Sequence, residues 1–230
     1  MWKYIVAIIT FSALTNAWAN TELTELETQW LTAGWPVLTY AKEMNLPLDI
    51  MVQPDASPGD APLAMGFEGG RCKLVLSMRG NPAAESAWAK IAPAQRNVVI
   101  EAMTAHEIGH CWRYLQGAWH ALPAGFVEVG EETGSNKAMV RQKQEMRETR
   151  REEGFADLVG LAWTLRRHPE QYAQVHAWFE QARHDQPVPG SYHDTRVWIQ
   201  LAKDGTAFEN KGNLFEQVQT LWRKGLVREN

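Results

Sequence analysis

Apolar residues recur at helical spacing over most of the chain, and short apolar runs typical of strands are confined to residues 48–78. The runs predict strands at 48–52, 63–67 and 72–78, and the last two flank the hairpin signal Glu68-Gly69-Gly70-Arg71. This order of elements predicts an α+β fold that is mainly helical, with a short sheet near its N-terminus. The predicted helices span 20–44 (broken or kinked at Trp35-Pro36), 82–91, 93–115, 136–167, 169–183, 194–203 and 213–226.

The first 19 residues have the pattern of a secretory signal peptide. Lys3 precedes an apolar run, Tyr4 to Leu14, which is too short for a comfortable membrane span, and Ala17-Trp18-Ala19 is a small-x-small cleavage signal. We expect residues 1–19 to be removed, and a retained anchor is the alternative. No later segment approaches ~18 consecutive apolar residues, so no membrane span is expected after cleavage. Residues 20–230 are long enough for one sizeable core, which predicts a single domain. The signal peptide predicts that this domain is periplasmic or secreted.

Net charge and cysteine usage narrow the classes of partner and compartment. Removing Lys3 from the 23 basic residues leaves 22 against 27 acidic ones, a net charge of −5, which gives no electrostatic reason to expect a nucleic acid partner. An exported chain meets an oxidising compartment, so Cys72 and Cys111 are predicted to form a disulfide, with two buried thiols as the alternative. The bridge would pin the strand at 72–78 beside the helix at 93–115.

The segment His106-Glu107-Ile108-Gly109-His110 lies near the C-terminal end of the helix predicted at 93–115. Residues four apart share one helix face, so His106 and His110 can direct two imidazoles to one metal ion. Zn²⁺ accepts imidazole nitrogens at ~2.0–2.1 Å and keeps a position open for water in catalytic sites. Glu107 lies one step around the helix and can take a proton from a zinc-bound water as the general base. A chance occurrence of the motif is the alternative, and its helical context favours the zinc site.

A third ligand is expected from a second helix packed against the first, because catalytic zinc usually has three protein ligands. Glu153 and Asp157 lie four residues apart where the helix at 136–167 turns apolar, and buried carboxylates are costly unless paired or bound to metal. We predict Glu153 as the third ligand and Asp157 as the carboxylate that orients a ligand imidazole. The alternative is a pair of surface acids partnered by Arg150 and Arg151. Other candidate ligands are His120, Glu128, Glu131, Glu132, Glu152 and the histidines that follow Asp157.

Small residues on both helices are expected to serve the site. Gly109 costs ~1 kcal/mol relative to Ala within a helix, and we attribute it to the close approach of a metal and a substrate to the helix backbone. Gly154, Ala156 and Gly160 are expected to let the motif helix approach the second helix closely.

HEIGH at 106–110 and EGFAD at 153–157 together resemble the gluzincin metallopeptidases, and most nearly the branch with H-E-x-x-H and a downstream E-x-x-A-D. The resemblance covers about 106–196 and implies a small zincin-like domain, mainly helical, whose edge strand binds extended substrate. We assign that role to the strand at 72–78. The site roles that the resemblance implies are zinc ligation by His106, His110 and Glu153, general-base catalysis by Glu107 and support of a ligand histidine by Asp157.

The same branch often carries a later H-P…R element near its active site. Residues 191–196, SYHDTR, match this element only in part: they contain a histidine and an arginine but no proline after the histidine. His193 is therefore a candidate for steadying the oxyanion, with an ordinary loop histidine as the alternative.

These features predict a zinc metallopeptidase that hydrolyses protein or peptide substrates outside the cytoplasm. The rivals are a catalytically silent zincin-like module that binds metal or a partner, and a helical interaction protein without metal. Intact Glu107 argues against the silent module. The sequence leaves open whether substrates are proteins, short peptides or peptidoglycan stems, whether cleavage is internal or terminal, and whether the irregular segment 117–135 is a lid.

Overall fold

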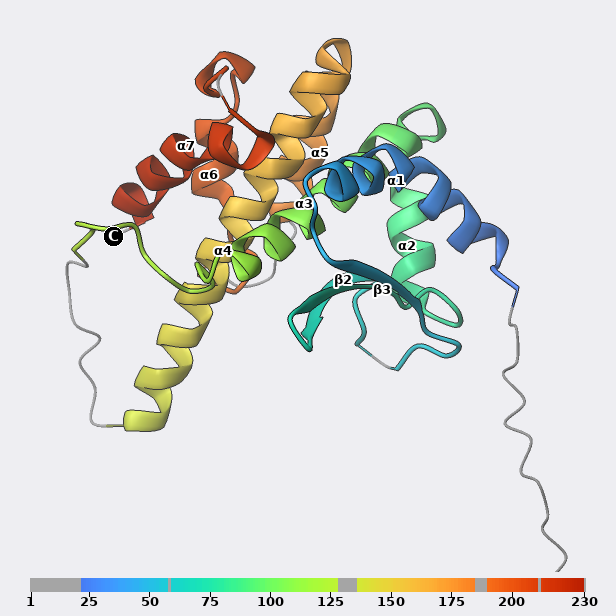
Figure 1. Ribbon diagram of the computed structural model, residues 1–230, viewed down its shortest axis with the longest axis horizontal. Coiled ribbons are helices and arrows are strands. Elements are labelled where there is room, and N and C mark those ends of the chain that lie inside the picture. Colours follow the sequence, from blue (N-terminus) through green and yellow to red (C-terminus); the bar gives the residue numbers. More distant parts are fainter. Residues whose placement is uncertain (1–21, 58, 128–135, 185–189, 211, 230) are drawn as a thin grey trace, which may run out of the picture.

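The computed structural model describes residues 22–57, 59–127, 136–184, 190–210 and 212–229, which form an α+β fold. The predicted signal peptide lies outside these residues, as does part of the segment 117–135. Helices dominate, and a small sheet lies to one side of them (Figure 1). The elements are α1 (Glu25–Glu43), β1 (Leu48–Val52), β2 (Leu63–Glu68), β3 (Arg71–Leu76), α2 (Pro82–Lys90), η1 (Pro93–Gln95), α3 (Arg96–Leu115), α4 (Lys137–Arg167), η2 (Pro169–Gln171), α5 (Tyr172–His184), α6 (Arg196–Leu201), η3 (Gly205–Ala207) and α7 (Leu214–Glu229).

β3 is the central strand of a three-stranded sheet with the order β1-β3-β2. β1 runs parallel to β3, and β2 runs antiparallel to it through a turn at Gly69 and Gly70. Both turn residues have positive φ, which suits a tight two-residue hairpin and confirms the predicted turn. The prediction that the strand at 72–78 is an edge strand is wrong, because β1 and β2 occupy its two sides. β1 and β2 are the two edge strands, and the outer edge of each pairs with no other described strand.

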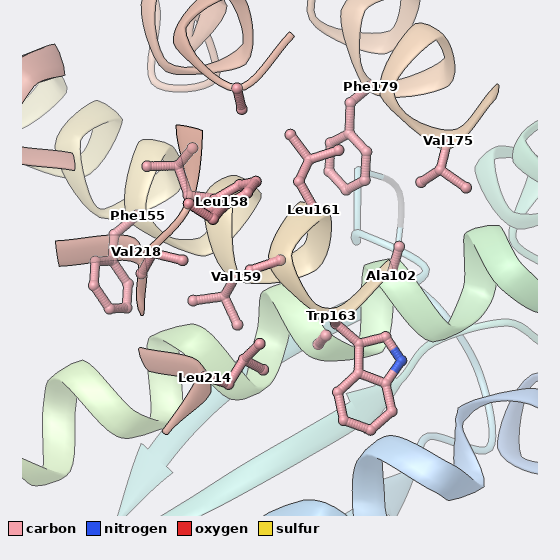
Figure 2. Packing of buried hydrophobic residues seen from close by; sticks show 14 of the residues in the cluster. Ala102, Phe155, Leu158, Val159, Leu161, Trp163, Val175, Phe179, Leu214 and Val218 are labelled. Carbon is pink, nitrogen blue, oxygen red and sulfur yellow. The ribbon is translucent and has the colours of Figure 1, made fainter. Parts of the chain in front are cut away.

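The motif helix α3 packs against α4, α1 and β2, and α4 in turn packs against α5, α6 and α7 (Figure 1). The second half of α4 is buried, as its apolar sequence predicts, while its charged first half is largely exposed. None of the described helices is both long and apolar enough to cross a membrane. Fully burying a large apolar side chain contributes roughly 1.5–3 kcal/mol, so this core sets the relative position of α3 and α4. Figure 2 shows its residues Phe155, Leu158, Val159, Leu161 and Trp163 of α4 with Ala102 of α3, Val175 and Phe179 of α5, and Leu214 and Val218 of α7.

Small residues allow α3 and α4 to approach closely. A Cβ added at Gly109 would lie 3.2 Å from the Cα of Ala156, and one at Gly160 would lie 2.7 Å from the carbonyl oxygen of Ala102. The attribution of Gly109 to the approach of metal and substrate is therefore wrong, because the glycine faces α4. Ala156 and Gly160 serve the close packing as predicted, whereas Gly154 faces α6.

Helix α1 runs through Pro36, where the sequence predicted a break or kink. The missing N–H of a proline leaves the carbonyl four residues earlier without its helical partner. That carbonyl belongs to the exposed Thr32, where water can satisfy it. The helix begins with a capping box, in which Thr24 and Glu27 each bond the backbone of the other.

A disulfide joins Cys72 of β3 to Cys111 of α3, which confirms the predicted pairing. Both cysteines are fully buried. Because Cys111 directly follows His110, the bridge ties the central strand of the sheet to the helix that carries both motif histidines.

Candidate metal centre

Two helices bring three ligand-type side chains together. His106 and His110 lie one turn apart on α3, and Glu153 lies on α4, which packs against it. One ligand atom from each residue lies within 4.8 Å of the other two, so the group could hold a metal ion. Both histidines are buried, and the Glu153 side chain is 12% exposed.

The spacing of these atoms fits one small cation. Nε2 of His106 lies 3.1 Å from Nε2 of His110. The carboxylate oxygens of Glu153 lie 3.3 Å from Nε2 of His110 and 3.5 Å from Nε2 of His106. Ligand atoms bound at ~2.0–2.1 Å to a tetrahedral ion lie roughly 3.3–3.4 Å apart. The three groups therefore stand close to the separations that such an ion requires.

Asp157 fixes the orientation of the His106 ring. Its Oδ1 lies 2.9 Å from Nδ1 of His106, so the ring can donate its Nδ1–H there and leave Nε2 for a cation. The fully buried Asp157 also accepts hydrogen bonds from Nε and Nη2 of Arg183, at 2.8 and 2.6 Å, and from the hydroxyl of Thr195. The structure thus places Asp157 where its predicted role requires.

The alternative view of Glu153 and Asp157 as surface acids is wrong. Their arginine neighbour is Arg183 of α5, and neither carboxylate is exposed. Arg150 and Arg151 instead bind the carboxylate of Glu229 near the C-terminus, at 2.6 and 2.9 Å. These ion pairs fasten α7 to α4.

Neighbouring charges keep both carboxylates of the site ionised. Burial raises the pKa of Glu153, but its hydrogen bond to His110 and the charges of His110, His106 and Arg183 outweigh burial and bring it to about 2. Burial also raises the pKa of Asp157, but Arg183 and His106 hold it below its usual range. Desolvation lowers the pKa of His110 and of Arg183, but the carboxylates beside them leave both pKa values above their usual range.

Glu107 lies beside the metal-binding group without belonging to it. Its side chain lines the cleft that opens onto the group. Burial raises the pKa of the Glu107 carboxyl, and the charges of His106 and His110 oppose that rise. A carboxyl with a raised pKa can both accept and return a proton, which is what a general base and acid must do.

His193 lies at the rim of the site. Its Nε2 is 3.6 Å from Oε2 of Glu153, its side chain is 50% exposed, and it lines the cleft. Desolvation lowers its pKa, so the neutral imidazole is favoured. The structure brings His193 to the site, and its role at an oxyanion stays a prediction.

The other candidate ligands lie elsewhere. Glu152 forms a buried ion pair with Arg113. His120 lies 3.5 Å from Glu148, away from the three ligand atoms. The loop acids Glu128, Glu131 and Glu132 fall outside the described residues.

A cleft of about 390 Å³ opens onto the metal-binding group. Strand β2 and the residues just before it form one wall, and α5 forms another. One open edge of the sheet therefore borders the candidate site, but it belongs to β2 and not to the predicted strand at 72–78. The lining residues are Ala61, Pro62, Leu63, Ala64, Met65, Met103, His106, Glu107, His110, Trp119, Thr149, Glu153, Trp178, Phe179, Ala182, Arg183 and His193.

Sequence reasoning missed Arg183, Thr195 and Trp119. Arg183 comes 26 residues after Asp157 on a different helix, so no helical spacing links the two. The only signal was indirect: a buried carboxylate as predicted at Asp157 requires a cationic or hydrogen-bonding partner. Trp119 lies in the irregular segment after α3, where no periodicity predicts its position.

Comparison of the chain with protein-family models, curated proteins and solved structures finds no match. The interpretation of this site therefore depends on its own geometry and chemistry.

Proposed function

We propose that the chain is a zincin-like metallopeptidase of the gluzincin type, which hydrolyses peptide bonds with Zn²⁺ held by His106, His110 and Glu153. The proposal depends chiefly on one observation, the 3.1–3.5 Å spacing between the ligand atoms of three side chains contributed by two helices. Two imidazoles and one carboxylate form a donor set typical of catalytic zinc. Asp157 supports the proposal because it orients His106 as ligand histidines usually require.

Zn²⁺ bound by these residues would supply Lewis-acid chemistry, which polarises a carbonyl and makes a water more acidic. Glu107 takes the proton of the attacking water and later delivers it to the nitrogen of the leaving amine. His193 stands at the open side of the site, where its Nε2 can donate a hydrogen bond to the charge that develops on the substrate oxygen.

The open edge of β2 gives the substrate backbone a place to bind. The backbone N–H of Ser77 donates to the carbonyl of Pro62, and hydrogen-bonded pairs alternate along an antiparallel ladder. The N–H and C=O groups of Leu63 and Met65 therefore point away from β3, at the stretch of β2 that lines the cleft. An extended polypeptide can add there as a further strand.

The same reasoning extends to the compartment in which the chain acts. A buried disulfide beside the metal-binding helix is typical of chains that fold in an oxidising environment. With the signal-like residues 1–19, it supports a periplasmic or secreted location.

Glu107→Gln tests the mechanism, because the amide keeps the shape of the side chain and cannot accept the proton. We expect the zinc-loaded variant to retain metal and to lose roughly 10²–10⁴-fold in turnover of a denatured protein or a peptide library. The control is Glu145→Gln, which alters an exposed acid on the projecting half of α4. Equal turnover by parent and Glu107→Gln would rule out the proposed role, and no turnover by the parent would count against the proposed function.

A further inference from the structure

The chemistry of the cleft wall distinguishes between substrate classes. Its polar groups are Thr149 and the residues in and around the metal-binding group. The remaining lining side chains are apolar, and they surround the approach from β2 and from α5. A substrate with small or charged side chains, such as a peptidoglycan stem, would leave this apolar surface in contact with water. The apolar lining residues are Ala61, Pro62, Leu63, Ala64, Met65, Met103, Trp119, Trp178, Phe179 and Ala182.

Trp119 connects this apolar wall to the metal-binding group. Its ring lies edge-on to His110, with the two ring centres 5.6 Å apart. The Trp119 ring also lies edge-on to Phe67 of β2, with the ring centres 5.4 Å apart. Phe67 in turn stacks on Tyr114, with the ring centres 3.8 Å apart. Nδ1 of His110 is buried and has no hydrogen-bond partner among the described residues, and the imidazole lies between the rings of His106 and Trp119, at 4.7 and 5.6 Å between ring centres. Trp119 thus contacts a metal ligand and the edge strand at once.

A buried ion pair holds the segment that carries Trp119. Arg113 of α3 and Glu152 of α4 are almost fully buried and lie 2.6 Å apart. Glu152 accepts the backbone N–H of His120 at 2.9 Å, and Arg113 donates to the carbonyl of Ala121 at 3.0 Å. His120 has a φ of 59°, a left-handed conformation that few non-glycine residues adopt. The bonds on both sides of His120 therefore fix the position of Trp119 before a substrate arrives.

Resting on the function proposed above, we infer that Trp119 is the specificity-determining residue of this cleft. The substrate class is an extended polypeptide segment that carries an aromatic or large aliphatic side chain beside the scissile bond. Trp119 provides the ring against which that side chain packs, in contact with His110 and next to the open edge of β2. Because the ring is already held in place, its packing costs little additional ordering when the substrate binds.

The expected selectivity follows from the size of the apolar contact. A methylene-sized difference in an apolar pocket changes kcat/KM by roughly 10–200-fold. We therefore expect the zinc-loaded full chain to prefer Phe or Leu over Ala by at least ~10-fold at one position flanking the cleaved bond. A peptide set in which one position at a time is Ala, Leu or Phe measures this ratio directly.

Substitution of Trp119 separates selectivity from catalysis. We expect Trp119→Ala to bring the Phe-to-Ala ratio of kcat/KM to within about threefold of unity, and Trp119→Phe to keep most of the preference. Trp35→Ala is the matched control, because Trp35 is 62% exposed on α1 and lies outside the cleft. An unchanged ratio in Trp119→Ala, with metal retained, overturns the inference. If Trp119→Ala does not fold, Trp119→Leu serves instead, and an undiminished preference for Phe over Ala overturns the inference.

Binding to Glu107→Gln distinguishes failure of this inference from failure of the proposed function. Labelled Phe and Ala peptides are titrated into Glu107→Gln and into the double variant that also carries Trp119→Ala, and fluorescence anisotropy reports their affinities. A preference for the Phe peptide that disappears in the double variant supports the inference even if the parent hydrolyses nothing. Equal affinity for both peptides in Glu107→Gln, or no binding of either, overturns it.

Discussion

Oδ1 of Asp157 on α4 lies 2.9 Å from Nδ1 of His106 on α3, although 51 residues separate them in the sequence. The same buried carboxylate accepts two hydrogen bonds from Arg183 of α5. One acid therefore joins three helices directly behind the metal-binding group. A carboxylate in this position determines which ring nitrogen of His106 faces the cation.

Asp157→Asn removes the negative charge of Asp157 and keeps the shape of the side chain. We expect zinc affinity to fall roughly 10–100-fold, because His106 loses its charged partner and Arg183 keeps only the more distant carboxylate of Glu153. Competition with a chromophoric chelator measures the change. Asp49→Asn is the control, since it removes the ion pairs of Asp49 with Arg71 and Lys73 on the sheet, outside the metal-binding group. Unchanged zinc affinity in Asp157→Asn would show that the contact does not support the ligand.

Gly109→Ala tests the close packing of α3 on α4. The added methyl group would meet Ala156 and Val159 at 3.2 Å, so we expect a loss of about 1–3 kcal/mol in the free energy of unfolding. Helix propensity alone predicts the opposite, a gain of ~1 kcal/mol. Urea denaturation decides between the two, and a stabilised variant would contradict the packing described for this helix pair.

Replacing Cys72 and Cys111 together by serine tests the link between the sheet and α3. The bridge spans 39 residues, and closing a loop of this size stabilises the folded chain by about 2–4 kcal/mol. We expect a loss of that order in urea denaturation of the double variant. Dithiothreitol should destabilise the parent by a similar amount and leave the double variant unaffected, and a reductant effect of equal size in both would count against the bridge.

Glu27 is expected to make stability depend on pH at the acidic end. The hydrogen bonds from Arg79 lower its pKa from the ordinary value of 4.5, despite burial. A carboxyl whose pKa is lowered by folding stabilises the fold above the unfolded pKa, and this contribution disappears as the pH falls from 4.5 through the lower folded value. Unfolding free energies measured across this window should fall less steeply for Glu27→Gln than for the parent. The exposed Glu25, substituted by Gln, is the control. Parallel curves for parent and Glu27→Gln would contradict the assignment.

Local patterns predicted most of the elements, because periodicity and turn residues act over a few positions. The strands, the hairpin turn and the long helix α4 lie close to their predicted bounds. The sequence did not decide whether α1 breaks at Pro36 or continues through it, because that depends on which side of the helix faces solvent. The central position of β3 was missed as well, because strand order depends on the parallel pairing of β1, which no local signal encodes.

The candidate site was predictable where spacing fixes geometry. His106 and His110 share a helix face, and Glu153 and Asp157 share another, so pairing two helices was enough to predict the group. Arg183 comes from a third helix, and no spacing rule relates it to these residues. Zinc itself and the hydrolysis of peptide bonds stay predictions, which depend on the donor set and on Glu107.

The metal content of the purified full chain tests the central claim most directly. The parent, Glu153→Ala and Glu107→Gln are purified without added metal, and the zinc content per chain is measured by inductively coupled plasma mass spectrometry. We predict about one zinc per chain in the parent and in Glu107→Gln and much less in Glu153→Ala, since catalytic zinc usually has three protein ligands. A parent without zinc, or equal zinc in the parent and Glu153→Ala, would contradict the assignment of His106, His110 and Glu153 as a zinc site.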